Sequence, residues 1–256
     1  MKPLLRLEGF QLCDSCLVTV QAMTLTSSKW MSRWHSCMVT LMRQSTSEFP
    51  MGTPQLSKAS FRPSAADPHF LIGVEGDPCF VFLHVDDLVI AGRNLAAFKA
   101  QIKAYFNMKD LGNINYVLGM KVTRDRSCWI INLSQELYIE NMLINFGMGD
   151  CKPVSTPQFP SSRLTPTSTA SASINYQRAV GLLNYLVSCT RPDIAYTASC
   201  LAQFLNNPSK EHEMVFKHVL QYLKGTKDWA LSLGHSQDNS IITAYCDADW
   251  GSNFDS

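Results

Sequence analysis

The sequence predicts an α+β fold in which β-hairpins come first and a group of helices follows. Hydrophobic residues make up 46% of the 256-residue chain and charged residues 17%. These values are typical of globular proteins and exclude a coiled coil, a collagen-like fibre and general disorder. Short apolar runs between turn residues fill much of 59–150, which indicates antiparallel strands. Stretches of helical spacing with capping residues follow at 174–235, which indicates packed helices.

Charge and cysteine content narrow the class of protein further. With 22 Lys and Arg against 21 Asp and Glu, the net charge is +1, so no overall basic field indicates a nucleic-acid partner. Nine Cys at irregular spacing favour reduced thiols over a disulfide framework. No apolar run reaches the length of a membrane span, and the start lacks the apolar region of a secretory signal. We therefore expect an intracellular protein with no membrane partner.

Residues 1–58 differ from the rest of the chain. They contain no Ile, Tyr or Asn, are rich in Ser, Thr and Met, and show no sustained helical or strand periodicity. We expect this leader to be poorly ordered and the folded part to begin at Ala59.

The first predicted hairpin carries two adjacent acids. Residues 69–74 and 80–84 have strand patterns, and the apolar run that follows is interrupted by Asp86 and Asp87. This pattern predicts a tight hairpin with both acids at its bend. A helix is predicted next, at 94–106.

A second predicted hairpin is followed by another helix. Residues 116–123 and 128–133 have strand patterns and are joined by the turn 124–127. Ser134 can cap a helix that runs to Phe146 and ends at Gly147.

Four prolines among many Ser and Thr mark residues 151–173 as a linker. Three helices are then predicted, at 176–188, at 192–205 with Pro192 in the first turn, and at 209–224 with Ser209 as the cap and Gly225 as the stop. Short strands are predicted at 229–233 and 241–246, where a further domain would begin.

The chemistry of Asp86 and Asp87 suits a magnesium site, because carboxylates between apolar arms must be met by solvent, by donors or by a cation. Successive strand residues point to opposite faces, so a two-metal site would need another carboxylate from elsewhere. A solvated Asp-Asp bend is the structural alternative.

Several long blocks resemble one family in the same order. The blocks FLHVDDLVIAG, FNMKDLGNINYVLGMKV and INLSQELYIENMLINFGMGDCKPVSTP resemble the reverse transcriptase of copia-type LTR retrotransposons. Downstream, YQRAVGLLNYLVSCTRPDIAYTASCLAQFLNNPSKEH, HVLQYLKGT and AYCDADWGS resemble the thumb and connection segment and the first strand of RNase H. The resemblance covers 59–256.

This resemblance implies the remnant of a right-hand polymerase palm, an antiparallel sheet with helices, at 59–150. It further implies a helical thumb and connection segment at 174–235 and a truncated RNase H start at 236–256. Its partner would be an RNA/DNA primer–template and its cofactor Mg²⁺, with no small-molecule cofactor.

The resemblance also implies roles for single residues. Asp86 would coordinate Mg²⁺ with Asp87 in support, and Asp247 would be the first acid of an incomplete RNase H site. Leu118 and Gly119 resemble the primer-grip hairpin. His84 departs from the family, which usually has Tyr at this position.

The family's first catalytic Asp, in a block resembling QMDVKTAFLHGDL, has no counterpart in residues 1–80. Because Trp and Met have single codons, the leader sequence fixes part of the DNA that encodes it. When the DNA for residues 29–43 is read with the frame shifted by two bases, it can encode MDVKMAFLHGDLDE. A stretch resembling SLYGLKQSPRxW is also absent. We infer a frame-shifted, partly deleted copy.

Three hypotheses for function follow. The first is a catalytically inactive reverse transcriptase fragment, the second an intact but divergent polymerase, and the third a domesticated nucleic-acid-binding or interaction protein. Four lysines on and after the last helix are candidate nucleic-acid contacts, with a solvated charged face as the alternative: Lys210, Lys217, Lys224 and Lys227.

Overall fold

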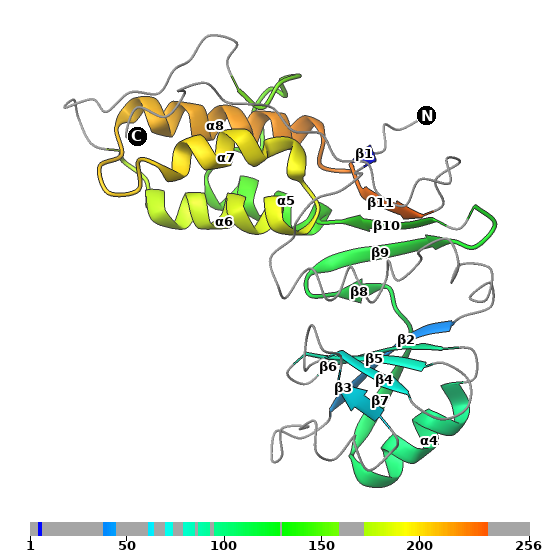
Figure 1. The fold of residues 1–256 in the computed structure, drawn as a ribbon. Helices are drawn as coiled ribbons and strands as arrows, with labels where there is room; N and C mark the ends of the chain where they lie inside the picture. The colour runs from blue at the N-terminus through cyan, green and yellow to red at the C-terminus, as the bar shows by residue number, and fades with distance from the viewer. Residues whose placement is uncertain are drawn as a thin grey trace, which may run out of the picture.

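Two β-sheets and a layer of helices make up the described part of the chain (Figure 1). The computed structural model describes residues 5–6, 38–44, 61–63, 70–73, 79–84, 87–92, 95–128, 130–158 and 172–234. Figure 1 shows the five-stranded sheet between the six-stranded sheet and the helices α5 to α8. The α+β class is confirmed.

The six-stranded sheet has the order β3-β4-β5-β6-β2-β7, and every pair in it is antiparallel. Its strands are β2 (Met38–Gln44), β3 (Phe61–Pro63), β4 (Phe70–Gly73), β5 (Cys79–His84), β6 (Asp87–Gly92) and β7 (Met108–Asn113). Helix α4 (Leu95–Tyr105) covers this sheet through Leu95, Phe98 and Ile102, whose spacing gives one apolar helix face. The predicted strands at 69–74 and 80–84, and the predicted helix at 94–106, are therefore confirmed within one or two residues.

Strand β2 comes from the leader, where no ordered element was expected. It lies between β6 and β7, and Met42 is completely buried in the core under α4. The expectation of poor order is wrong for Met38–Gln44, because pairing on both sides and the burial of Met42 outweigh the weak periodicity. Apart from Leu5–Arg6, the rest of the leader lies outside the described residues.

Strand β7 was not predicted either. Lys109, Asp110 and Gly112 are all poor strand formers, and the strand depends on pairing with β2. Its ladder shifts between Thr40 and Met42, and Gly112 takes a φ of +76° that suits glycine. The Asp110 carboxylate accepts the Gly112 N–H at 2.9 Å and pairs with Lys99.

The five-stranded sheet has the order β1-β11-β10-β9-β8. Its strands are β1 (Leu5–Arg6), β8 (Tyr116–Val117), β9 (Met120–Asp125), β10 (Ile130–Ser134) and β11 (Leu231–Gly234). The prediction of one strand at 116–123 is wrong, because a tight turn at Leu118 and Gly119 divides it into β8 and β9. Strand β1 pairs with β11 in parallel, and all other pairs are antiparallel.

Four α-helices form the helical layer, together with a 3-10 turn, η1. These are α5 (Glu136–Asn145), α6 (Tyr176–Cys189), η1 (Pro192–Ile194), α7 (Ala195–Ala202) and α8 (Lys210–Gly225). One apolar core joins α5, α6, α7 and α8, with Leu183, Leu201 and Phe216 fully buried in it. None of the helices in the described part of the chain is both long and apolar enough to cross a membrane.

The ends of these helices differ from the prediction in three places. Gln135 precedes α5 as its cap, because Ser134 remains paired with Lys121 as the last residue of β10. The predicted helix 192–205 is a 3-10 turn followed by the shorter α7. Gly225 is the last residue of α8 rather than its stop, while Ser209 caps this helix as predicted.

A buried arginine ties the start of α7 to the end of α8. Arg191 has no exposed surface, and its guanidinium pairs with Asp193 at 2.7 Å. It also donates to the backbone and side-chain oxygens of Thr226 and lies over the rings of Tyr222 and Trp229. A charge this deeply buried is tolerated because partners surround it.

Candidate nucleic-acid interface

The predicted hairpin is present as β5 and β6, and Asp87 is the first residue of β6. Strands β5 and β6 pair so that His84 lies opposite Asp87, and the His84 ring stacks on Phe82 with centroids 6.2 Å apart. Asp87 is half-buried, and Asp86 lies outside the described residues. We call β5 and β6 with their bend the Asp-Asp hairpin.

The strands beside Asp87 bring cations to its level in the sheet. Arg43 of β2 is paired with Asp87, and Lys109 of β7 is paired with Arg43. The backbone register therefore sets Asp87, Arg43 and Lys109 in one row across three strands, with no second acid at the two positions beside Asp87.

A magnesium site needs several oxygen ligands together. Within the ranges that the structure describes, no three His, Cys, Asp or Glu side chains lie close enough to hold a metal ion. The described residues alone do not fit the ion, and the roles of Asp86 and Asp87 stay predictions. Asp247 of the predicted nuclease also lies outside these ranges.

The predicted primer-grip residues form a tight turn between β8 and β9, which we call the 118–119 turn. Leu118 has a φ of +47° and Gly119 a φ of +74°. Two successive positive values match the twist of a two-residue hairpin, although Leu is unusual in this conformation. The Leu118 carbonyl accepts a hydrogen bond of 2.5 Å from the Tyr185 hydroxyl on α6.

One apolar cluster connects the Asp-Asp hairpin with the 118–119 turn. Phe82 of β5 and Val89 of β6 belong to the same buried group as Val117 and Met120, which flank the turn. Cys189 of α6 completes the contact from the helical side. The two predicted functional hairpins are therefore held by a common core.

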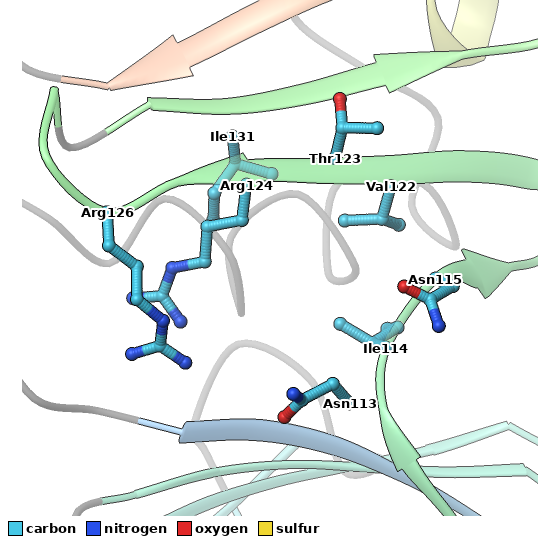
Figure 2. A pocket seen from close by; sticks show the side chains of 8 residues that line it. All are labelled: Asn113, Ile114, Asn115, Val122, Thr123, Arg124, Arg126 and Ile131. Atoms are coloured by element: carbon cyan, nitrogen blue, oxygen red, sulfur yellow. The ribbon is translucent and has the colours of Figure 1, made fainter.

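A pocket of about 370 Å³ lies where the strands β7 and β9 come together, and Figure 2 shows its walls. Arg124 and Arg126 extend from β9 and the turn after it toward Asn113 at the end of β7. The pocket, called the arginine pocket below, is lined by Asn113, Ile114, Asn115, Val122, Thr123, Arg124, Arg126 and Ile131.

Asp125, which lies between these arginines in the sequence, forms hydrogen bonds within its own turn. Asp125 accepts hydrogen bonds from the hydroxyl and N–H of Ser127 and from the N–H of Cys128. The Ser127 hydroxyl and these N–H groups hold the pKa of Asp125 below its usual range. Sequence reasoning treated 124–127 only as a turn; the Arg-Asp-Arg pattern was the available signal.

Three of the four candidate lysines make contacts within the chain. Lys217 pairs with Glu213 at 2.7 Å, and Lys224 donates to the backbone oxygen of Gly149. Lys227 pairs with Glu140 on α5. These contacts favour a structural role for the three, whose nucleic-acid role stays a prediction.

The contact of Lys217 belongs to a small network around the buried carboxylate of Glu213. Glu213 also accepts hydrogen bonds from the N–H and hydroxyl of Ser173. Lys217 and then Ser173 lower the pKa of Glu213 to about 2. Lys210 is the exposed first residue of α8.

Comparison with known proteins gives a consistent set of relatives. The family model described as "Reverse transcriptase (RNA-dependent DNA polymerase)" matches residues 42–160, and the match therefore starts inside the leader. The Retrovirus-related Pol polyprotein from transposon TNT 1-94 of Nicotiana tabacum is 39% identical over 202 residues, which are 70% of this chain and 15% of the relative.

Two proteins of Arabidopsis thaliana are also similar. An uncharacterized mitochondrial protein is 36% identical over 178 residues, covering 67% of this chain and 71% of that protein. The Pol polyprotein from transposon RE1 is 34% identical over 181 residues, 69% of this chain and 12% of the relative. The chain thus spans a small part of the Pol polyproteins it matches. No solved structure matches it.

Proposed function

The chain belongs to the reverse transcriptase family of copia-type retrotransposons, and we propose that it binds primer–template nucleic acid without polymerising DNA. The observation that carries the binding half of this proposal is the arginine pocket, which is lined by the end of β7, the loop after it, and β9, one strand of the hairpin that holds the 118–119 turn. We place this function inside the cell.

The pocket offers the groups that a nucleic-acid backbone needs. Arginine guanidinium groups bind phosphate through paired, charge-assisted hydrogen bonds, and the amides of Asn113 and Asn115 can add neutral ones. The apolar wall of Ile114 and Ile131 can face a sugar or a base. A backbone phosphate bound between Arg124 and Arg126 fits this combination best.

The absence of polymerisation is proposed from the row beside Asp87. In-line phosphoryl transfer uses metal ions clamped by carboxylates from separate strands. At the position paired with Asp87, β2 carries Arg43, and Lys109 follows on β7. Neither paired position supplies a further carboxylate, so we expect Asp86 and Asp87 to form at most half of a site.

Binding is tested with a fluorescently labelled RNA/DNA primer–template and anisotropy over a range of salt concentrations. Replacing both Arg124 and Arg126 by Ala should weaken binding about tenfold or more and reduce the salt dependence by one to two counterions, roughly. The matched control replaces Arg178 and Lys152, two exposed cations outside the pocket, by Ala. Equal losses in both double variants would show a general charge effect and contradict a specific pocket.

The domesticated-protein hypothesis predicts the same binding but a different history. We propose a frame-shifted, partly deleted copy as the origin, which the genomic locus tests directly. Family sequence in a second reading frame beside residues 29–43 would support decay, whereas a purifying pattern across related loci would favour a retained binding role.

A further inference from the structure

A single hydroxyl connects the helical layer to the 118–119 turn. Tyr185 lies on α6, and its Oη donates to the Leu118 carbonyl at 2.5 Å although the two residues are distant in the sequence. The bond acts on the backbone of the turn itself, so it constrains the turn and not merely a neighbouring side chain.

The backbone of the turn needs such a constraint. Leu118 has a φ of +47°, which is sterically unfavourable for a residue with a Cβ. Such conformations persist when surrounding contacts determine them, and they concentrate at functional sites. A hydrogen bond to the carbonyl of the strained residue is a contact of this kind.

The residue after Leu118 is adapted to the same neighbour. A Cβ on Gly119 would lie 3.3 Å from the Tyr185 hydroxyl, which is tighter than most real contacts. Glycine therefore provides both the φ of +74° and the space for the tyrosine.

Tyr185 is itself held in place. The Tyr138 ring of α5 meets it edge to face, with centroids 4.9 Å apart, and the Tyr138 hydroxyl reaches the Leu182 carbonyl at 3.5 Å. One helical turn after Tyr185, Cys189 is buried in the cluster that contains Val117 and Met120. The tyrosine is thus fixed relative to both flanks of the turn.

We infer that Tyr185 is a positioning residue that holds the 118–119 turn in the shape that meets nucleic acid. For the ligand of the turn, the inference rests on the proposed function. Through this bond α6 constrains the position of the 118–119 turn relative to the helical layer.

The first test uses the full chain without nucleic acid. Tyr185→Phe removes only the hydroxyl, and hydrogen exchange at residues 116–122 should become about tenfold faster, as expected for the loss of one strong hydrogen bond. Tyr138→Phe is the matched control, because it removes a neighbouring hydroxyl and leaves the bond to Leu118 intact. Exchange at the turn that is unchanged in Tyr185→Phe would overturn the inference.

The second test measures primer–template affinity and the unfolding temperature of the same variants. Well below the unfolding temperature of either variant, Tyr185→Phe should bind about fivefold more weakly than Tyr138→Phe. Equal affinity in the two variants, or a loss that follows stability in both, would overturn a positioning role.

The two measurements distinguish a failure of the inference about Tyr185 from a failure of the proposed function. A wild-type chain that does not bind primer–template would overturn the proposed function. The exchange result would still decide whether Tyr185 holds the turn, because it is obtained without any ligand.

Discussion

His212 shows how burial controls a single ionisable group. It has no exposed surface in the first turn of α8, stacks on Phe204, and accepts the Ser209 N–H at Nδ1. Its Nε2 has no hydrogen-bond partner among the described residues. Burial lowers the pKa of His212 below its ordinary value of 6.5, although the nearby Glu211 opposes this shift. The neutral ring is therefore part of the native helix cap.

We predict that the chain loses stability as the pH falls through about 6.5 and below. The unfolded chain binds a proton at His212 near pH 6.5, whereas the folded chain binds it only at lower pH, so protons favour unfolding. His212→Asn, whose oxygen can still accept from Ser209, should show a smaller decline between pH 7 and pH 5. Equal slopes in urea unfolding would contradict this role.

The carboxylate of Glu213 acts in a separate pH range. Its pKa is lowered to about 2, so its stabilising effect is present above its ordinary value of 4.5 and is lost as the pH falls from there toward 2. Between pH 5 and pH 6.5 this contribution is present in full and constant, so it does not add to the pH dependence of stability expected from His212.

Arg191 permits a prediction about a buried charge. Replacing it by Met should lower the free energy of unfolding by about 3–5 kcal/mol, because the largely buried Asp193 would lose its cation and, among the described residues, keep only the hydrogen bond from the Tyr222 hydroxyl. Lysine should not restore stability, since it cannot reproduce the planar contacts with Asp193 and Thr226. Arg178→Ala, at an exposed site, is the control, and a similar small effect in both would refute the prediction.

Among the elements, those with their own periodicity could be predicted from sequence and those made by distant pairing could not. The Asp-Asp hairpin, α4 and the helices α6 and α8 have apolar spacing and turn or capping residues that indicate them locally. Strands β2 and β7 lack such signals, since among the described strands β7 is paired with β2 alone and β2 is paired with β6 and β7.

In the candidate site, too, some parts could be predicted from the sequence and others could not. The acids and the hairpin at 118–119 were indicated by family blocks, whereas the strand pattern alone indicated one strand at 116–123, because Leu rarely adopts a positive φ. The arginine pocket was missed because Asn113 and Arg124 belong to different sheets, and only folding brings them together.

The 118–119 turn gives a paired prediction at the level of one element. Gly119→Ala should destabilise the chain by about 1–2 kcal/mol, because alanine resists a φ of +74° and its Cβ would crowd Tyr185. Gly181→Ala is the matched control: a Cβ there meets nothing within 4 Å in α6 and should stabilise by up to about 1 kcal/mol. If urea unfolding shows the free energy of unfolding changing in the same direction for both variants, the strain assigned to Gly119 is contradicted.

Strand β2 is tested by its buried methionine. Met42→Ala should cost about 2–5 kcal/mol of unfolding free energy, since the side chain is fully buried beneath α4. Met214→Ala, at a residue 58% exposed on α8, should change stability little. If Met42→Ala is equally harmless, the leader does not contribute a core strand.

For the whole molecule we predict no template-directed nucleotide addition with Mg²⁺ or Mn²⁺. One carboxylate pair beside Arg43 and Lys109 does not make a two-ion clamp. Restoring the reading frame of residues 19–53 should not be sufficient, because the missing family stretch would still leave template and nucleotide unpositioned. Primer extension that is abolished by Asp86→Asn would overturn this prediction and establish a divergent polymerase.

The pairing of β1 with β11 has a consequence for biosynthesis. Leu5 is synthesised long before its partner Leu231, so this edge of the five-stranded sheet cannot form until β11 has left the ribosome. Pairing across such a separation also slows folding, because the entropy cost of closing a long loop must be met before any stabilising contact forms. Until then the outer edge of β11 is unprotected, and nascent chains that meet one another could join there instead.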